Sequence, residues 1–406
     1  MKTSLFLFFM SVCFFSNAQN TQSNAADVKP ALEFKCKPYL QNMQPTGVSV
    51  FWMMNNDCTS WLEYGETDQL GKVAYNSENG QIDACSEIQK IRLNDLTPGK
   101  TYYYRTASKG IIKYGPYNVV YKDTVYSPVH SFTLAQKNQD HFSFLLFADI
   151  HNQPAYIKDV VARENTVDFV IFNGDVVADI SSDKQIYQGF LDKMSEFFAA
   201  DKPFIYVRGN HETRGSHSRA LFKYFDYPSN RYYDNLNYGN TAITFFDGGE
   251  DKDDKKYESY YGLANYVPYR KEQAQWYSEL INTAAYKKKE NKIVLNHIPI
   301  YPAYANDKEG GGDWFGANDL RVNFMPLFTK AKIDLMLAGH THMPALLSPK
   351  ETQTSYSVGI TGSPQYEDKQ SERRYMAYIV VEVNGSHITV TEKRPDGTLL
   401  KKMEVK

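Results

Sequence analysis

Long apolar runs are missing from this sequence outside its first residues, and neither charge sign dominates. Over 406 residues the formal net charge is only -2. A helix needs roughly 20 apolar residues to cross a bilayer, so no transmembrane segment is expected beyond the N-terminus. Proteins that coat nucleic acid or bind membrane surfaces usually carry a basic excess. The sequence therefore argues against both classes.

Cysteine is also scarce. After the N-terminal apolar run only Cys36, Cys58 and Cys85 remain, and they are not closely paired. Three scattered cysteines form neither a disulfide framework nor a structural zinc site. One disulfide plus a free thiol would suit an oxidising compartment.

The N-terminus has the composition of an export signal. Lys2 precedes an apolar run over residues 5–15, and Ala18 supplies a small residue at the expected cleavage site. We therefore expect a signal peptide over residues 1–18, a polar linker over 19–30 and an exported protein, either periplasmic or secreted. The alternatives are a buried first strand or helix, or a lipid anchor at Cys13.

Residues 31–135 predict an all-β domain. Bulky and β-branched residues alternate with polar ones in short segments such as 48–52, 60–64 and 101–105. Turn sequences such as Asn79-Gly80 separate them, and helical periodicity is not evident. This pattern is typical of an antiparallel β-sandwich.

From about residue 140 the pattern changes to that of an α/β domain, expected over residues 140–392. Five apolar runs each end in polar residues, and amphipathic helical stretches at 182–200 and 271–286 lie between some of them. Such a sheet places its site at the carboxyl ends of the strands. Hairpins at 375–383 and 387–392 are expected to complete a second sheet, and residues 393–406 to form a C-terminal strand or tail.

The residues at these five strand ends predict a metal site. Two carboxylates, one amide and four imidazoles form a mixed nitrogen and oxygen set, which suits Fe, Mn or Zn better than Ca or Mg. Seven ligands are too many for one tetrahedral ion, but they suit two divalent or trivalent ions about 3.5–4 Å apart. The predicted ligands are Asp149, His151, Asp175, Asn210, His297, His340 and His342.

The same residues lie in ordered motifs that resemble the calcineurin-like metallophosphoesterases. The preceding region resembles the fibronectin type III-like N-terminal domain of purple acid phosphatases, including a corner at 96–102 where Tyr102 is expected to pack inward and bond to backbone. The resemblance implies a four-layer α/β/β/α sandwich preceded by an all-β sandwich. The motifs are Asp149-Ile150-His151, Gly174-Asp175, Gly209-Asn210-His211-Glu212, His297 and Gly339-His340-Thr341-His342.

The resemblance also implies a role for each residue. His211 would be the general acid for the leaving oxygen, or would stabilise the transition state. Glu212 would orient a ligand or His211, the alternative being a solvent-facing loop charge. In the implied ligand set, one metal binds Asp149, His151 and His342, the other binds Asn210, His297 and His340, and Asp175 bridges them.

Two positions depart from the purple acid phosphatase pattern. Those enzymes carry a tyrosine ligand three residues after the bridging aspartate, where this chain has Ala178. They also usually lack a histidine at the position of His151. We therefore expect neither an iron–tyrosinate centre nor a purple protein.

Substrate contacts are predicted around the Asn210-His211 loop. A guanidinium there can bind phosphate oxygens in a bidentate manner, although Arg208 is equally suited to bracing the loop. The stretch 301–318 follows a predicted ligand and is expected to form a rim over the site, where Trp314 would stack on a base or aryl group or simply pack. The candidates are Arg208, Arg214, His217, Arg219 and Trp314.

Together these features predict an exported enzyme that hydrolyses small-molecule phosphate esters by attack of a metal-bound hydroxide. Phosphomonoesters are favoured, with phosphodiester or nucleotide hydrolysis as the alternative. A non-catalytic surface-binding module is the alternative from a different class. The sequence specifies neither the physiological substrate nor the oligomeric state.

Overall fold

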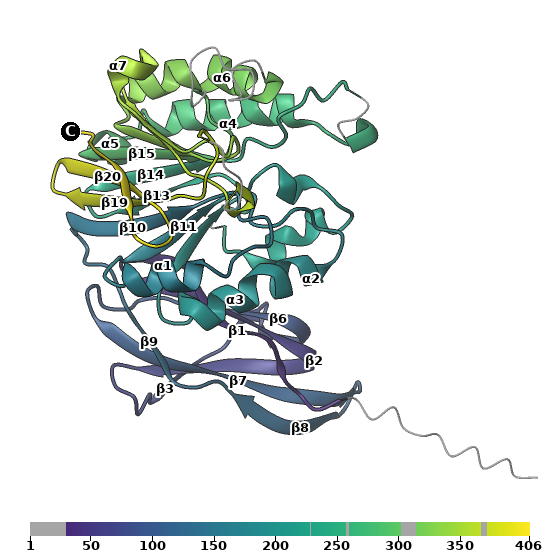
Figure 1. Ribbon diagram of the computed structural model, residues 1–406. Helices are drawn as coiled ribbons and strands as arrows, with labels where there is room; N and C mark the ends of the chain where they lie inside the picture. Colours follow the sequence, from purple (N-terminus) through teal and green to yellow (C-terminus); the bar gives the residue numbers. More distant parts are fainter. Residues whose placement is uncertain (1–29, 228, 257–259, 302–313, 367–371) are drawn as a thin grey trace, which may run out of the picture. The chain divides into compact units, whose positions relative to one another are not determined.

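A computed structural model describes residues 30–227, 229–256, 260–301, 314–366 and 372–406. Residues 32–406 form one compact unit (Figure 1). The predicted signal peptide and linker lie outside the described residues, apart from Pro30. None of the helices described is long and apolar enough to cross a membrane.

The first hundred residues of this unit are all β, as predicted. The strand β2 (Gly47–Gly65) is central: its first half pairs with β6 (Ala84–Leu93), and its second half pairs with β7 (Thr101–Tyr114). A register shift between residues 53 and 58 separates the halves, so one strand serves both parts of the sandwich. The remaining strands are β1 (Phe34–Gln44), β3 (Lys72–Ala74), β4 (Ser77–Glu78), β5 (Gln81–Ile82), β8 (Val119–Tyr126) and β9 (His130–Thr133).

The tyrosine corner is confirmed. The side chain of Tyr102 is buried in the sandwich core, and its hydroxyl accepts a hydrogen bond from the Thr97 backbone N–H at 3.0 Å. At the centre of the same core, fully buried Trp52 donates from Nε1 to Ser108 Oγ. The expected disulfide, however, is not formed: Cys36, Cys58 and Cys85 are all free thiols.

The second region contains two sheets packed face to face. In the first sheet, β10 (His141–Phe147), β11 (Phe169–Asn173) and β12 (Phe204–Val207) run parallel. The strands of the second sheet, in spatial order, are β13 (Asp234–Tyr238), β14 (Thr241–Phe246), β15 (Asn291–Asn296), β16 (Leu335–Ala338), β18 (Ser357–Ile360) and β17 (Ala345–Leu347).

The expectation that the C-terminal hairpins complete the second sheet is wrong. The strand β19 (Tyr378–Asn384) pairs antiparallel with β10, and β20 (His387–Lys393) and β21 (Leu399–Glu404) extend the first sheet from there. The five apolar runs are instead divided between the sheets, three in the first and two in the second. The hairpins therefore occupy the free edge of β10.

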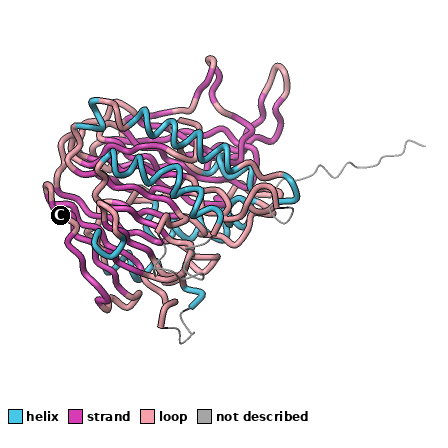
Figure 2. Tube along the Cα trace, turned by 90° about the horizontal axis from the view of Figure 1, so that it is seen from above, coloured by secondary structure: helices cyan, strands magenta, loops and turns pink. Residues whose placement is uncertain are grey.

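Helices cover the outer face of each sheet (Figure 1). On the first sheet lie α1 (Ile157–Arg163) and a continuous helical segment from α2 (Asp183–Ile186) through α3 (Asp192–Met194) to residue 199. On the second lie α4 (Tyr266–Leu280), α5 (Ala284–Lys287) and α6 (Phe315–Ala331), with α7 (Pro349–Thr352) nearby. Seen from above, helices overlie the strands (Figure 2). The predicted α/β/β/α layering is confirmed.

The sandwich is joined directly to the first sheet. Gln41 of β1 pairs in parallel with Phe204 of β12, so β1 continues this sheet beyond its third parallel strand. The Tyr39 hydroxyl donates to Tyr224 O at 2.9 Å, and the Tyr104 hydroxyl donates to Ala200 O at 2.6 Å. Buried hydrogen bonds and a shared sheet therefore connect the two regions within the unit 32–406.

Candidate metal centre

The predicted ligands all lie just beyond the carboxyl ends of strands. Asp149 and His151 follow β10, Asp175 follows β11, and Asn210 follows β12. In the second sheet His297 follows β15, whereas the pair His340 and His342 follows β16. The carboxyl edges of the two packed sheets therefore bring seven side chains from residues 149–342 to one place.

The backbone at these positions is strained. A positive φ is uncommon for a residue other than glycine and is concentrated at functional sites, where tertiary contacts sustain it. In a pair of ligands separated by one residue, the left-handed conformation at both positions turns the two side chains to the same side. Five predicted ligands have φ between 47° and 67°, namely Asp149, His151, Asp175, His340 and His342.

Glycines allow these loops to approach one another. A Cβ on Gly174 would lie 2.5 Å from His297 Nδ1, and a Cβ on Gly209 would lie 2.3 Å from the Asp175 backbone nitrogen. The loops after β10 and β11 are also joined by a backbone hydrogen bond, from His151 N–H to Asp175 O. Any side chain at either glycine would separate the strands that carry the ligands.

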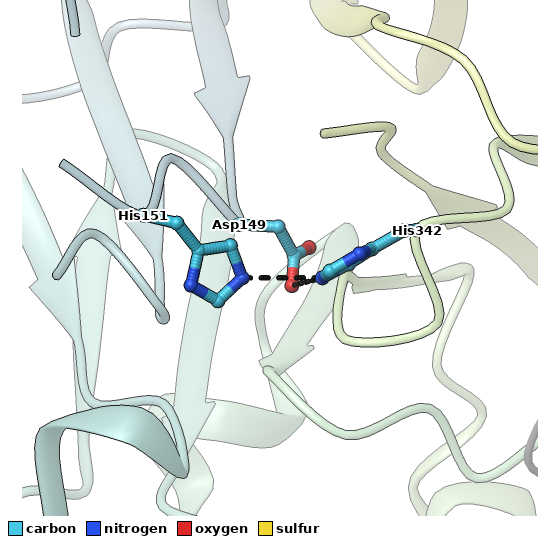
Figure 3. A group of neighbouring side chains, drawn as sticks. All are labelled: Asp149, His151 and His342. Atoms are coloured by element: carbon cyan, nitrogen blue, oxygen red, sulfur yellow. Dashed lines mark hydrogen bonds and ion pairs between the residues drawn. The ribbon is translucent and has the colours of Figure 1, made fainter. Parts of the chain in front are cut away.

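One group of ligand atoms is formed by Asp149, His151 and His342 (Figure 3). His342 Nε2 lies 3.2 Å from Asp149 Oδ1 and 3.2 Å from His151 Nε2. Two imidazole nitrogens and one carboxylate oxygen therefore face a common point. Burial lowers the pKa of His151 to about 4, so its ring is neutral and able to ligate at neutral pH.

A second group is formed by Asp175, His297 and His340. Asp175 Oδ2 lies 3.0 Å from His297 Nε2, while the His297 Nδ1–H donates to Asn173 O at 2.7 Å and so directs Nε2 into the site. Asp175 also belongs to a third group, with His151 and His211. It therefore lies between the first and second groups, where a bridging ligand is expected.

The orientation of Asn210 tests whether this group suits a cation. Its amide oxygen faces Asp175 Oδ2 at 3.2 Å and His340 Nδ1 at 2.8 Å, both of which are acceptors when unprotonated. Three mutually facing acceptors repel one another unless the amide is reversed or a cation lies among them. A cation among them would satisfy all three acceptors, whereas reversing the amide would let its NH₂ donate to both neighbours and its oxygen accept from Arg214 Nη2 at 2.8 Å. The donor set therefore fits a metal ion.

The buried carboxylates of the site favour positive charge at His297. Burial opposes the charged form of His297, but Asp175 and Asp149 outweigh it and raise its pKa to about 10. Burial likewise opposes ionisation of Asp175, whose pKa is nevertheless held well below its usual range, chiefly by His297. Two ionised, fully buried carboxylates demand a positive charge nearby.

His211 adjoins this site and is held by two contacts. Its Nδ1–H donates to Ala178 O at 2.7 Å, and Arg214 Nη1 donates to its Nε2 at 2.9 Å. Burial and Arg214 lower the pKa of His211, whereas Asp175 opposes that shift. The ring is therefore neutral here, with Arg214 on the nitrogen that faces the site.

Glu212 is fully buried, which rules out the solvent-facing alternative. Its carboxylate accepts hydrogen bonds from four backbone N–H groups: those of Gly209, Asp175, Val176 and Val177. Burial and Asp175 raise its pKa to about 7, while the N–H donors favour the ionised form. Glu212 thus connects the loop after β12 to the loop after β11.

The structure places only some of the predicted substrate contacts next to the predicted metal ligands. Arg208 Nη2 donates to Asp247 Oδ2 at 2.5 Å, and its guanidinium stacks over the Tyr232 ring at 3.9 Å, so it braces the loop. His217 Nε2 lies 3.2 Å from the Tyr224 hydroxyl, and among the described residues it contacts none of the predicted metal ligands. Trp314 lies edge-on to His340 with ring centroids 4.8 Å apart. Most of the predicted rim, 302–313, lies outside the described residues.

Sequence reasoning missed the loop after β14. Glu250 is 2% exposed and pairs with Arg214, while Asp247 is fully buried beside Arg208. Fully buried Arg270 donates to Gly248 O and Glu250 O and thereby fixes the loop. The signal was present: the apolar run 242–246 ends in Asp247, as the recognised strands end in their ligands.

Two packed sheets with Asp, Asn and His side chains at their shared carboxyl edge define a class of metal-dependent phosphoric ester hydrolases. The family model for calcineurin-like phosphoesterases matches residues 142–344, which is half of the chain. This protein therefore belongs to the calcineurin-like phosphoesterase family and is a metal-dependent phosphoric ester hydrolase.

Solved structures share this fold. The chain is similar to the purple acid phosphatase PPD1 from yellow lupin (Lupinus luteus), with a TM-score of 0.63 and 14% identity over 90% of this chain and 73% of that one. It is also similar to PhoD, with a TM-score of 0.59 and 12% identity over 91% of this chain and 93% of that one. At these identities the similarity concerns the fold. No curated protein matches the chain in sequence.

Proposed function

We propose that this protein is an exported phosphoesterase that uses two metal ions and prefers phosphomonoesters. Export is supported by the N-terminal sequence, with Lys2, the apolar run 5–15 and Ala18. The preference for monoesters rests on the resemblance to acid phosphatases. In the proposed ligand set, Asp149, His151 and His342 hold one ion, Asn210, His297 and His340 hold the other, and Asp175 bridges them.

The single observation that carries the proposal is the position of Asp175. It shares one group of closely spaced ligand atoms with His151 and another with His297 and His340. A carboxylate with two oxygens can serve two ions only if it lies between their ligand groups. The ions themselves are expected to be Fe, Mn or Zn because the donors mix nitrogen and oxygen.

Two side chains next to this centre suit the handling of a phosphoryl group. Ions bound there would neutralise phosphate oxygens and lower the pKa of an attacking water. Arg214 presents a guanidinium that can bind phosphate oxygens, and doing so would release His211 Nε2. With Nδ1–H held by Ala178 O and Nε2 released, His211 would take up a proton from water at Nε2 and then donate that proton to the leaving oxygen.

The test is a metal-dependence assay on the full chain. Chelator-treated protein is loaded with Mn, Zn or Fe and assayed with p-nitrophenyl phosphate and bis-p-nitrophenyl phosphate, while bound metal is counted by elemental analysis. We expect about two metal ions per chain and faster hydrolysis of the monoester. A protein that retains no metal and hydrolyses neither ester would refute the proposal. Faster cleavage of the diester would assign it to phosphodiesterases instead.

A further inference from the structure

A groove leads away from the metal centre across the loop that carries His211. It consists of two adjoining pockets that share Thr213, Arg219, Leu263 and Tyr266. The pocket nearer the centre is also lined by Arg214, whose Nη1 lies 2.9 Å from His211 Nε2. Arg214 therefore both contacts His211 and lines one end of this pair of pockets, which we call the arginine groove.

The lining of the arginine groove is cationic, although the whole chain carries a formal charge of -2. Five cationic side chains and two acidic ones, Glu250 and Glu272, line the two pockets. Three of the cations are paired: Arg208 with Asp247, and both Arg214 and Lys252 with Glu250. Each of these three cations therefore already has a carboxylate partner.

Two cations remain. Arg219 is exposed, lines both pockets, and forms no hydrogen bond or ion pair among the described residues. Arg231 lies over the rings of Tyr233 and Trp276, and its buried Nε has no hydrogen-bond partner within the described parts of the chain. Positive charge is therefore available in the groove, with Arg219 where the pockets meet.

The walls of the groove are aromatic. Half-buried Tyr232, Tyr266 and Tyr269 line its far part, and Tyr261 and Leu263, 70% and 72% exposed, lie beside its near part. Tyrosine rings beside guanidinium groups that have no carboxylate partner in the described part of the chain suit a ligand that offers both a flat ring and an anion. An aliphatic alcohol would use neither feature.

We infer that the arginine groove binds the leaving group of the substrate, and that this group is aromatic and carries a second negative charge bound by Arg219. The inference rests on the proposed function, because the groove is defined from the site of hydrolysis. A substrate of this class has one phosphate at the metal centre, a ring against the tyrosines and another anion at Arg219. A nucleoside bisphosphate combines these parts and serves as the probe.

The experiment compares matched substrates on the metal-loaded full chain: adenosine 3′,5′-bisphosphate, adenosine 5′-monophosphate and p-nitrophenyl phosphate. For the wild type we expect a KM at least about tenfold lower for the bisphosphate than for the monophosphate, the effect of one charge-assisted contact. Arg219→Gln should abolish this difference and leave kcat/KM for p-nitrophenyl phosphate within about twofold. Lys223→Gln is the control, because Lys223 is exposed on the same short helix (Ser218–Tyr224) and does not line the groove.

Equal KM values for the two nucleotides in the wild type would overturn the inference while leaving the proposed function intact. An equal loss on all three substrates in Arg219→Gln would also overturn it, since Arg219 would then act at the metal centre. If the wild type hydrolyses no ester with any metal, the proposed function fails. Calorimetric binding of the bisphosphate to chelator-treated protein then tests whether the arginine groove binds this ligand. Binding that Arg219→Gln weakens about tenfold supports the groove, and absence of binding refutes it.

Discussion

Replacing Glu212 by glutamine should damage the metal centre without touching a ligand. The carboxylate accepts four backbone N–H groups, at 2.9 Å from Gly209, 2.9 Å from Asp175, 2.7 Å from Val176 and 3.3 Å from Val177. Each carboxylate oxygen accepts two of them. A glutamine amide has one oxygen, so in either orientation its NH₂ faces two N–H donors.

The magnitude follows from those two donors. A buried donor without a partner costs about 1–3 kcal/mol, so Glu212→Gln should destabilise the protein by about 2–6 kcal/mol. Part of this cost is avoided if the loops carrying Asp175 and Gly209 move apart, which displaces the bridging ligand. Loss of an interaction that orients a ligand typically lowers metal affinity 10–100-fold. At limiting metal concentration the activity should fall together with the metal affinity, and it should recover partly when metal is in excess.

The assay is a metal titration of chelator-treated protein, followed by calorimetry and by hydrolysis of p-nitrophenyl phosphate, with unfolding in urea measured alongside. Glu392→Gln is the matched control for metal binding: Glu392 is likewise buried, at 2% exposed, but its carboxylate accepts a hydrogen bond from the Tyr375 hydroxyl, and it lies on β20 away from the predicted ligands. If Glu212→Gln binds metal and unfolds like the wild type, the carboxylate does not hold the two loops together.

Three further predictions concern single side chains. Asp175→Asn and His211→Ala should each lower kcat at least about 10²-fold, with bound metal reduced only in Asp175→Asn; near-normal turnover in either variant contradicts the role given to that residue. Arg214→Gln removes a charge that lowers the pKa of His211, so the alkaline limb of the kcat/KM profile should move to higher pH, and an unmoved limb means that His211 is not the acid. Burial raises the pKa of Glu392 to about 6, from 4.5, so stability is lost as pH rises through 6, and urea unfolding should show Glu392→Gln gaining about 2 kcal/mol over the wild type between about pH 4.5 and 7.5. A difference independent of pH would show that Glu392 titrates normally.

Local sequence was sufficient for the residues of the centre. Each ligand directly follows an apolar run, and a strand buried on both faces can be recognised from such a run alone. The motif around Asn210 and His211 carries its own turn residue, Gly209, whose missing Cβ leaves room for Asp175. These features depend on neighbours within a few residues, so they could be read before any fold was known.

Other features depended on partners distant in the chain. Arg208 suits a phosphate or a carboxylate equally well, and Asp247, 39 residues away, decides between them. The thiols of Cys36, Cys58 and Cys85 stay free although their number allowed a disulfide, because pairing requires Cβ atoms to meet and composition does not specify this.

By itself, the sequence predicted the side chains that meet at the carboxyl edge of the two sheets and the kind of strand that carries each of them. Only the tertiary structure decided that five similar strands divide between two sheets, and that β19 closes the free edge of β10 by pairing Asn384 with His141. The physical reason is that strand character comes from the strand's own residues, whereas the choice of neighbour depends on long-range pairing and loop closure. Folding likewise pairs Arg208 with Asp247 and Arg214 with Glu250, and leaves Arg219 without an ion pair among the described residues of the arginine groove.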